Sequence, residues 1–95
     1  MSAFVIVEID IHNMDLYRSY TQLTPDTIAA YDGKFLVRGG ETTLLEGDLQ
    51  PKRMVVLEFP SVDKATAWWH SDVYAGAKKI RQKAATTKMI IVEGV

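Results

Sequence analysis

Cysteine is absent from this 95-residue sequence, so the chain has neither a disulfide nor a thiolate metal site. That absence is consistent with a reducing cytoplasm. The chain also lacks an excess of one charge sign, because 11 basic and 12 acidic residues give a formal net charge of −1. A balanced charge argues against binding to nucleic acid or to anionic lipid. No apolar run approaches the roughly 20 residues that span a membrane, and the start, Met1 to Phe4, lacks the basic region of a secretory signal. We therefore expect a cytoplasmic protein with no nucleic-acid or membrane partner.

Repeats, low-complexity stretches and linkers are also missing, so we treat residues 1–95 as a single domain. A chain this short buries a smaller fraction of its surface than a long one, which makes its core marginal. With no disulfide available, association with a second copy is the remaining common way to add buried area.

Runs of β-branched and apolar residues predict strands at 3–11, 34–38, 53–59 and 88–93. We expect residues 41–46 to extend the second strand. A first helix is predicted from an N-cap at Asn13, with a break at Thr24-Pro25 before a second helical piece. Two more helices follow N-caps at Ser61 and Ser71. The expected buried stripes of the first and last helices are Leu16, Tyr20 and Leu23, and Val73, Ala77, Ile80 and Ala84.

The order β-α-β-β-α-β is that of an α+β, ferredoxin-like fold. Right-handed crossovers then place the four strands in the order 4-1-3-2, with every neighbouring pair antiparallel.

The helices of this order can cover only one face of a four-stranded sheet, so the other face is left open. Alternation along the strands places eleven residues on that open face, of which seven are apolar. The eleven are Phe4, Ile6, Glu8, Leu36, Arg38, Met54, Val56, Glu58, Met89, Ile91 and Glu93. Ile90 and Val92 are expected to face the helices. An open face bare to water should be mostly polar, so we expect a homodimer through this face.

Four segments, 33–40, 45–48, 56–61 and 69–81, together resemble the domain-of-unknown-function 1330 family, part of the dimeric α/β-barrel superfamily. Asp32-Gly33 stands where that family often has Gly-Gly. The resemblance implies a small dimer whose two sheets meet in a barrel, and it implies no particular reaction. Cofactor-free quinol monooxygenases, muconolactone isomerases and haem-using chlorite dismutases belong to the same superfamily, so the fold alone indicates no chemistry.

Arg38 is the first candidate for a ligand contact. It ends a strand just before Gly39-Gly40, where the backbone allows close approach, and a guanidinium there can bind a carboxylate through two hydrogen bonds. An ion pair with a strand-end acid such as Glu8, or a dimer contact, is the alternative interpretation.

Two acids and a histidine are candidates for proton transfer. Glu58 and Glu93 are expected at one end of the open face, where proximity would raise one pKa and create a general base. The alternative is that both are solvated acids at strand ends. His70 is a second catalytic candidate, although its neighbours Ser71 and Asp72 are explained by helix capping.

The last helix and the tryptophan pair supply further candidate ligand contacts. Tyr74, Lys78 and Arg81 share one helical face, where Tyr74 and Arg81 could line a pocket mouth or cover apolar residues. Trp68 and Trp69 point about 100° apart, so one is expected in the core while the other, Trp69, could floor a pocket.

We expect no metal and no cofactor, because two separated histidines form no ligand motif and the glycines match no phosphate loop. Three functions remain open. The first is binding or transformation of a small carboxylated or aromatic metabolite in a dimer-associated barrel pocket, with Arg38 orienting it and Glu58 moving a proton. The second is a non-catalytic homodimeric interaction module whose barrel interior is filled by Phe4, Ile6, Met54, Val56, Met89 and Ile91. The third is a metal- or haem-dependent oxygenase.

Overall fold

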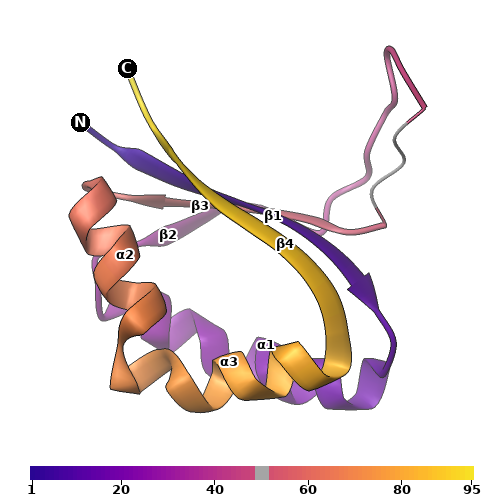
Figure 1. The fold of residues 1–95 in the computed structure, drawn as a ribbon, viewed down its shortest axis with the longest axis horizontal. Helices are drawn as coiled ribbons and strands as arrows, with labels where there is room; N and C mark the ends of the chain where they lie inside the picture. The colour runs from indigo at the N-terminus through magenta and orange to yellow at the C-terminus, as the bar shows by residue number, and fades with distance from the viewer. Residues whose placement is uncertain (49–51) are drawn as a thin grey trace.

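In the computed structural model, which describes residues 1–48 and 52–95, four strands and three helices form two layers (Figure 1). The elements are β1 (Ala3–Ile11), α1 (Met14–Ala29), β2 (Lys34–Arg38), β3 (Met54–Phe59), α2 (Val62–His70), α3 (Asp72–Ala84) and β4 (Ala85–Glu93). The sheet order is β2-β3-β1-β4, and every neighbouring pair is antiparallel. Figure 1 shows all three helices on one side of the sheet. The predicted α+β, ferredoxin-like fold is confirmed.

The first helix differs from the prediction because it continues through Pro25. α1 is unbroken from Met14 to Ala29, with Asn13 as the expected N-cap. A proline inside a helix removes one N–H donor and leaves the carbonyl four residues earlier without its usual partner. Here that carbonyl belongs to Thr21, and the side chain of Arg38 donates a hydrogen bond to it at 3.0 Å. A tertiary contact therefore replaces the helical bond that Pro25 removes.

Both later caps are confirmed, but the buried helix faces are rotated from their expected positions. Ser61 and Ser71 accept hydrogen bonds from backbone N–H groups three residues on. Leu23 and Val73 are exposed, at 48% and 55%. Tyr20, Ala77 and Ala84 are buried as predicted. The further buried residues are Tyr17, Thr24, Thr27 and Ile28 on α1, and Tyr74 and Arg81 on α3.

The core lies between the helices and the alternate residues of β1 and β3. Its largest fully buried side chains are Trp68, Tyr74, Phe59, Ile9, Ile28 and Val5. The ring centroids of Trp68 and Tyr74 are 4.1 Å apart. Trp68 Nε1 donates to Thr27 Oγ1 at 3.0 Å, which satisfies the one polar atom of the indole inside the core.

The expected faces of β4 are reversed. β4 begins at Ala85 rather than at 88, and it pairs Val7 with Met89 and Val5 with Ile91. Because paired residues point to the same face, Met89 and Ile91 face the helices. Lys88, Ile90 and Val92 lie on the open face instead, opposite Glu8, Ile6 and Phe4. Four consecutive apolar residues in β4 leave the alternation ambiguous from sequence alone.

Strand β2 contains an irregularity that moves Arg38 to the helix side of the sheet. Lys34 pairs with Glu58 and Phe35 with Leu57, but the register shifts between Phe35 and Val37, so that Arg38 pairs with Val55. A bulge of this kind re-aims the side chains that follow it. The expectation that Arg38 lies on the open face is therefore wrong, and residues 41–46 do not extend β2.

Candidate functional site

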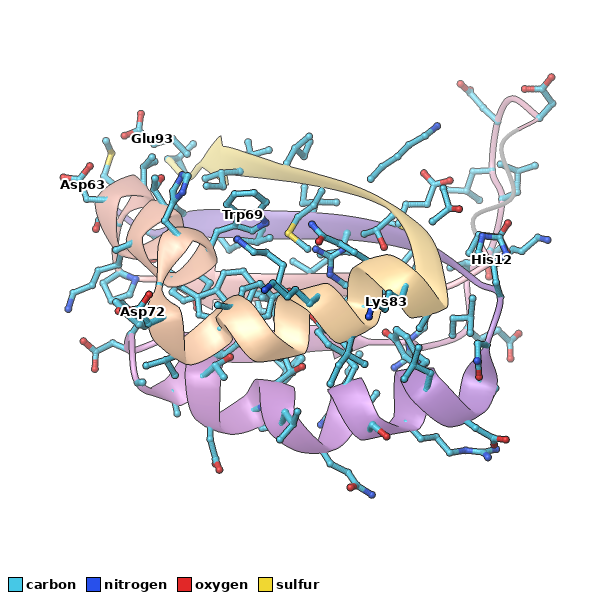
Figure 2. The ribbon with its side chains drawn as sticks, turned by 60° about the horizontal axis from the view of Figure 1, so that its bottom comes forward. His12, Asp63, Trp69, Asp72, Lys83 and Glu93 are labelled. Carbon is cyan, nitrogen blue, oxygen red and sulfur yellow. The ribbon has the colours of Figure 1, made fainter. Side chains whose placement is uncertain are left out.

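A cleft of ligand size runs along β4 on the helix side of the sheet. Its apolar part has a volume of about 250 Å³ and is lined by Val5, Ala65, Thr66, Trp68, Trp69, His70, Met89, Ile90 and Ile91. Its polar part has a volume of about 330 Å³ and is lined by Trp69, Arg81, Gln82, Ala85, Thr87 and Met89. Both parts share Trp69 and Met89, so we describe them together as the β4 groove. Figure 2 shows Trp69 lying between the helices and β4.

Arg81 supplies a buried positive charge at the polar part of the β4 groove. Its side chain comes from the last turn of α3, and the residue is only 5% exposed. Its Nε donates to the hydroxyl of Tyr74 at 3.3 Å. Within residues 1–48 and 52–95, no carboxylate lies close enough to Arg81 to form an ion pair. Position at a helix C-terminus stabilises a cation to some extent, but it supplies no counter-ion.

An unsatisfied hydroxyl lies in the same part of the groove as Arg81. The hydroxyl of Thr87 is enclosed and has no hydrogen-bond partner among the described residues. Thr87 lies on β4 across from Arg81 on α3, and both line the polar part. A buried hydroxyl without a partner is unfavourable, so the pair marks a place that suits an acceptor group.

Trp69 forms the wall between the two parts of the groove. Lys78 stacks on its ring, with Nζ 3.7 Å from the ring centroid, and also donates to the Trp69 carbonyl at 2.9 Å. His70 packs edge-on against the same ring, with centroids 5.0 Å apart. His70 itself is exposed and lies at the rim of the apolar part. These contacts hold the indole of Trp69 in one orientation, so that its ring can serve as a surface on which a ligand stacks.

Tyr74 lies behind Arg81 rather than at a pocket mouth. It is fully buried and lines neither part of the groove. Its hydroxyl also shares a 2.8 Å hydrogen bond with the hydroxyl of Tyr20. Burial is the main cause that raises the pKa of Tyr20 above its ordinary value, so Tyr20 stays neutral and is no counter-ion for Arg81.

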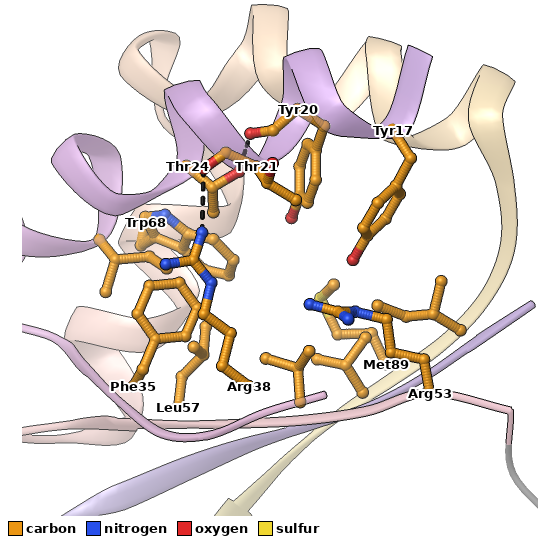
Figure 3. A pocket seen from close by; sticks show the side chains of 14 residues that line it. Tyr17, Tyr20, Thr21, Thr24, Phe35, Arg38, Arg53, Leu57, Trp68 and Met89 are labelled. Carbon is orange, nitrogen blue, oxygen red and sulfur yellow. Dashed lines mark hydrogen bonds between the residues drawn. The ribbon is translucent and has the colours of Figure 1, made fainter. Parts of the chain in front are cut away.

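A second, much smaller pocket lies beneath α1, and Figure 3 shows it from close by. We call it the α1 pocket. The side chains that matter for its chemistry are Tyr17, Tyr20, Arg38 and Arg53, and the rest are mostly apolar. Its inner space is about 20 Å³, which is room for roughly one water molecule. A whole metabolite does not fit inside the α1 pocket as it stands.

Arg38 is held at this pocket by two contacts. Its Nη2 donates to the carbonyl of Thr21, and its guanidinium stacks 4.4 Å above the centroid of the Phe35 ring. The ion pair between Arg38 and Glu8, which was the alternative interpretation, is absent from the described part of the chain. The arginine thus has a structural role that its position in the sequence did not indicate.

Arg53, like Thr87, is a residue that the sequence analysis missed. It lies just before β3, and Figure 3 shows its guanidinium pointing into the α1 pocket near the hydroxyl of Tyr17. Its Nε is enclosed and has no acceptor among the described residues. This guanidinium lies so close to Gly39 that a Cβ at position 39 would clash with it. Arg53 lies two residues before the buried Val55, so alternation along the strand could have predicted that both side chains point toward the helices.

The two acids proposed as a pair lie on opposite faces of the sheet. Glu58 pairs with Phe4 and Glu93 with Ala3, and neighbouring residues on β1 point in opposite directions. Glu58 instead forms an ion pair with Lys34 at 3.4 Å. The expected position of Glu93 on the open face is therefore wrong, and with it the hypothesis of a paired-carboxylate base.

In the described part of the chain, no group of three or more histidine, cysteine or acidic side chains is arranged to hold a metal ion. None of the helices in that part is long and apolar enough to cross a membrane.

Comparison with known proteins places the chain in a family and a fold. A family model described as "Domain of unknown function (DUF1330)" matches residues 2–95. No protein with a curated description matches the chain significantly.

Solved structures match over nearly the whole chain. A protein of unknown function from Rhodopseudomonas palustris is 19% identical with a TM-score of 0.79, covering 99% of this chain and 82% of its own. A dimeric ferredoxin-like protein from Jannaschia is 12% identical with a TM-score of 0.76, and the match covers 99% of this chain and 100% of that one. SnoaB, a cofactor-independent oxygenase from Streptomyces nogalater, is 13% identical with a TM-score of 0.68, over 99% of this chain and 93% of its own. At these identities the likeness shows the fold.

Proposed function

The chain belongs to the DUF1330 family, and we propose that it binds a small molecule with a carboxylate and an apolar or aromatic body in the β4 groove. The observation that carries this proposal is Arg81, a residue that is only 5% exposed and whose guanidinium has no carboxylate partner in the described chain. A buried charge without a partner is strongly unfavourable. A ligand carboxylate supplies the missing counter-ion, and the hydroxyl of Thr87 lines the same part of the groove as a further donor.

The apolar part of the groove suits the body of that ligand. Trp69 presents an oriented ring between the two parts, and Met89 and Ile91 form the floor from β4. The apolar part, at about 250 Å³, is just below the size range of small-molecule sites, and the polar part, at about 330 Å³, is at its lower end. Small aryl or alkyl carboxylates therefore match the groove in both size and polarity.

The other candidate residues take different roles in this proposal. Tyr74 is a positioning residue, because it contacts Arg81 through its hydroxyl and reaches neither part of the groove. His70, at the rim of the apolar part, is the titratable side chain best placed to exchange a proton with a bound ligand. Glu58 faces the other side of the sheet and has no access to this groove.

Fluorescence titration tests the proposal, using phenylacetate as probe and its neutral analogue phenylacetamide as control. We expect phenylacetate to change the tryptophan fluorescence saturably and phenylacetamide to bind at least about tenfold more weakly, because only the carboxylate pairs with Arg81. Trp69→Phe should remove most of the signal change, which would show that the change comes from Trp69 and not from Trp68.

Matched arginine variants separate this site from general charge effects. Arg81→Gln should weaken phenylacetate binding by about tenfold or more, whereas Arg18→Gln, at an exposed arginine on α1, should leave it unchanged. Arg81→Lys should restore part of the affinity. Equal binding of the acid and the amide by the original protein would refute the proposal.

We also propose that the open face of the sheet is covered by a second copy of the chain. The side chains that make it apolar are Phe4, Ile6, Val37, Met54, Val56, Ile90 and Val92, with Ile90 57% and Val92 41% exposed. Charged residues lie at its ends, where Glu8 is opposite Lys88 and Lys34 pairs with Glu58. An apolar patch bordered by charges is typical of a protein interface. The dimeric structural neighbour from Jannaschia supports this arrangement.

Sedimentation equilibrium tests the dimer directly. We expect a particle of about twice the 10.7 kDa chain mass at micromolar concentration. Ile6→Lys, which puts a charge in the middle of the face, should give the single-chain mass, and Arg18→Lys should not. A folded single-chain particle for the unmodified protein would rule the dimer out. The β4 groove opens on the helix side, so its ligand binding is tested separately.

A further inference from the structure

We propose that Arg38 and Arg53 form a second binding site, for the oxyanion group of a small carboxylate or phosphate, at the mouth of the α1 pocket. This site uses other charged residues than the β4 groove, whose arginine is Arg81, although Trp68 and Met89 line both the α1 pocket and the groove.

The first argument is uncompensated charge. Both guanidinium groups line one pocket, and its described lining contains no aspartate or glutamate. Neither arginine forms an ion pair with a described residue, and residues 49–51, Leu-Gln-Pro, contain no acid in their sequence. Two neighbouring cations without a counter-ion repel each other, and an anion between them removes that repulsion.

The second argument is the enclosed Nε of Arg53. This N–H is shut off from solvent and has no acceptor among the described residues. A donor left in that state loses its hydrogen bond to water without replacement. An oxyanion at the pocket would provide the acceptor. Gly39, with a φ of 73°, provides the space in which the guanidinium lies, because a side chain there would displace it.

The third argument is that Arg38 is already oriented toward the pocket. One of its nitrogens is engaged by the Thr21 carbonyl that Pro25 leaves free, and its plane rests on Phe35. A guanidinium has five N–H donors, so this anchor leaves others available for an anion. Holding the side chain before a ligand arrives reduces the loss of conformational entropy on binding.

The tyrosines of the pocket are neutral and supply no negative charge to the two arginines. Tyr17 lies beside Arg53, whose guanidinium carbon is 5.5 Å from the centroid of the Tyr17 ring. Burial raises the pKa of Tyr17 even though Arg53 acts in the other direction, so Tyr17 remains protonated at neutral pH. Neither Tyr17 nor Tyr20 can therefore neutralise the two arginines.

The size of the pocket limits what it takes. An inner space of about 20 Å³ admits one or two oxygen atoms, so the oxyanion group enters while the rest of the ligand remains outside. Arg38 is exposed and Arg53 half-buried, which places the binding groups at the mouth rather than in the interior.

NMR of the arginine side chains tests the proposal without an activity assay. The Nε–H resonance of Arg53, identified by its absence in Arg53→Gln, is followed while sodium acetate, sodium phosphate or sodium chloride is added at one fixed ionic strength. We expect a saturable shift with acetate or phosphate, and no saturable shift with chloride. Saturation by acetate alone identifies a carboxylate as the group bound, and saturation by phosphate alone identifies a phosphate.

Three variants provide the controls. Arg38→Gln should weaken the binding by about tenfold or more. Arg18→Gln and Arg81→Gln should leave it unchanged, and the latter separates this site from the β4 groove. If Arg53→Gln does not fold, the resonance can be assigned by connectivity and the Arg38→Gln titration decides the question. A shift that does not saturate, or that chloride reproduces, overturns the proposal.

Discussion

The contact between Arg38 and the Thr21 carbonyl leads to a quantitative prediction about Pro25. Replacing Pro25 with alanine restores the N–H that a helix normally directs to Thr21. Proline inside a helix is about 3 kcal/mol less favourable than alanine. Because proline also restricts the unfolded chain, it adds about 0.4–1 kcal/mol to the free energy of unfolding, which alanine would lose. Part of the difference is already offset by the 3.0 Å hydrogen bond from Arg38. We therefore expect Pro25→Ala to raise the free energy of unfolding by about 1 to 2 kcal/mol.

The same substitution should change what Arg38 contributes. In the original protein, Arg38→Met removes the hydrogen bond to Thr21 and the stacking on Phe35, a loss of about 1 to 2 kcal/mol. In the Pro25→Ala background the carbonyl has its own helical donor, so Arg38→Met removes only the stacking, about 0.5 to 1 kcal/mol. The two substitutions should therefore show a coupling of about 1 kcal/mol.

Urea denaturation of the four proteins, at one fixed protein concentration because association adds to apparent stability, measures this coupling. Additive effects within about 0.5 kcal/mol would refute the reasoning. In that case the bond between Arg38 and Thr21 would contribute nothing to stability, and Pro25 would be tolerated in α1 for another reason.

Three further outcomes follow from single contacts. Thr27→Val should lower the free energy of unfolding by about 1 to 3 kcal/mol in urea denaturation, because it leaves the buried indole N–H of Trp68 without an acceptor; an unchanged midpoint would contradict this. Tyr20 has a raised pKa, so the folded state keeps a proton that the unfolded state loses above pH 10; stability should fall as pH rises beyond that value, and Tyr20→Phe should make the fall shallower when unfolding is measured between pH 8 and 11. Gly39→Ala should destabilise the protein by about 1 to 2 kcal/mol, since Gly39 has a positive φ and its new side chain would displace Arg53; an equal effect in an Arg53→Ala background would show that the clash plays no part.

Local signals were enough to predict the elements and their order. Strands β1 and β2 have the predicted bounds, and the N-caps at Asn13, Ser61 and Ser71 are observed as expected. Caps, turn residues and apolar alternation act over a few residues, so they can be interpreted without knowing what packs against them. The βαββαβ order then allows few topologies, and the observed sheet is one of them.

The candidate site was only partly predictable, because it depends on which way side chains point after the elements pair. Trp69, His70 and Arg81 were identified from the sequence and lie together at the β4 groove. Arg53 and Thr87 were not identified, since an unsatisfied donor is a property of the packed state and not of a residue type. Alternation from Val55 could have indicated the direction of Arg53.

The sequence by itself determined the order of the strands and helices, their N-caps, the α+β fold and the presence of an apolar open face, because each follows from short-range patterns of apolar and capping residues. Tertiary structure decided the rest. Pairing with β1 set the faces of β4, and a shift in register turned Arg38 toward the helices. α1 continued through Pro25, where the distant Arg38 donates to the Thr21 carbonyl that lacks its helical partner. Each of these outcomes depends on a partner far away in the chain, and such a partner leaves no mark on the local sequence.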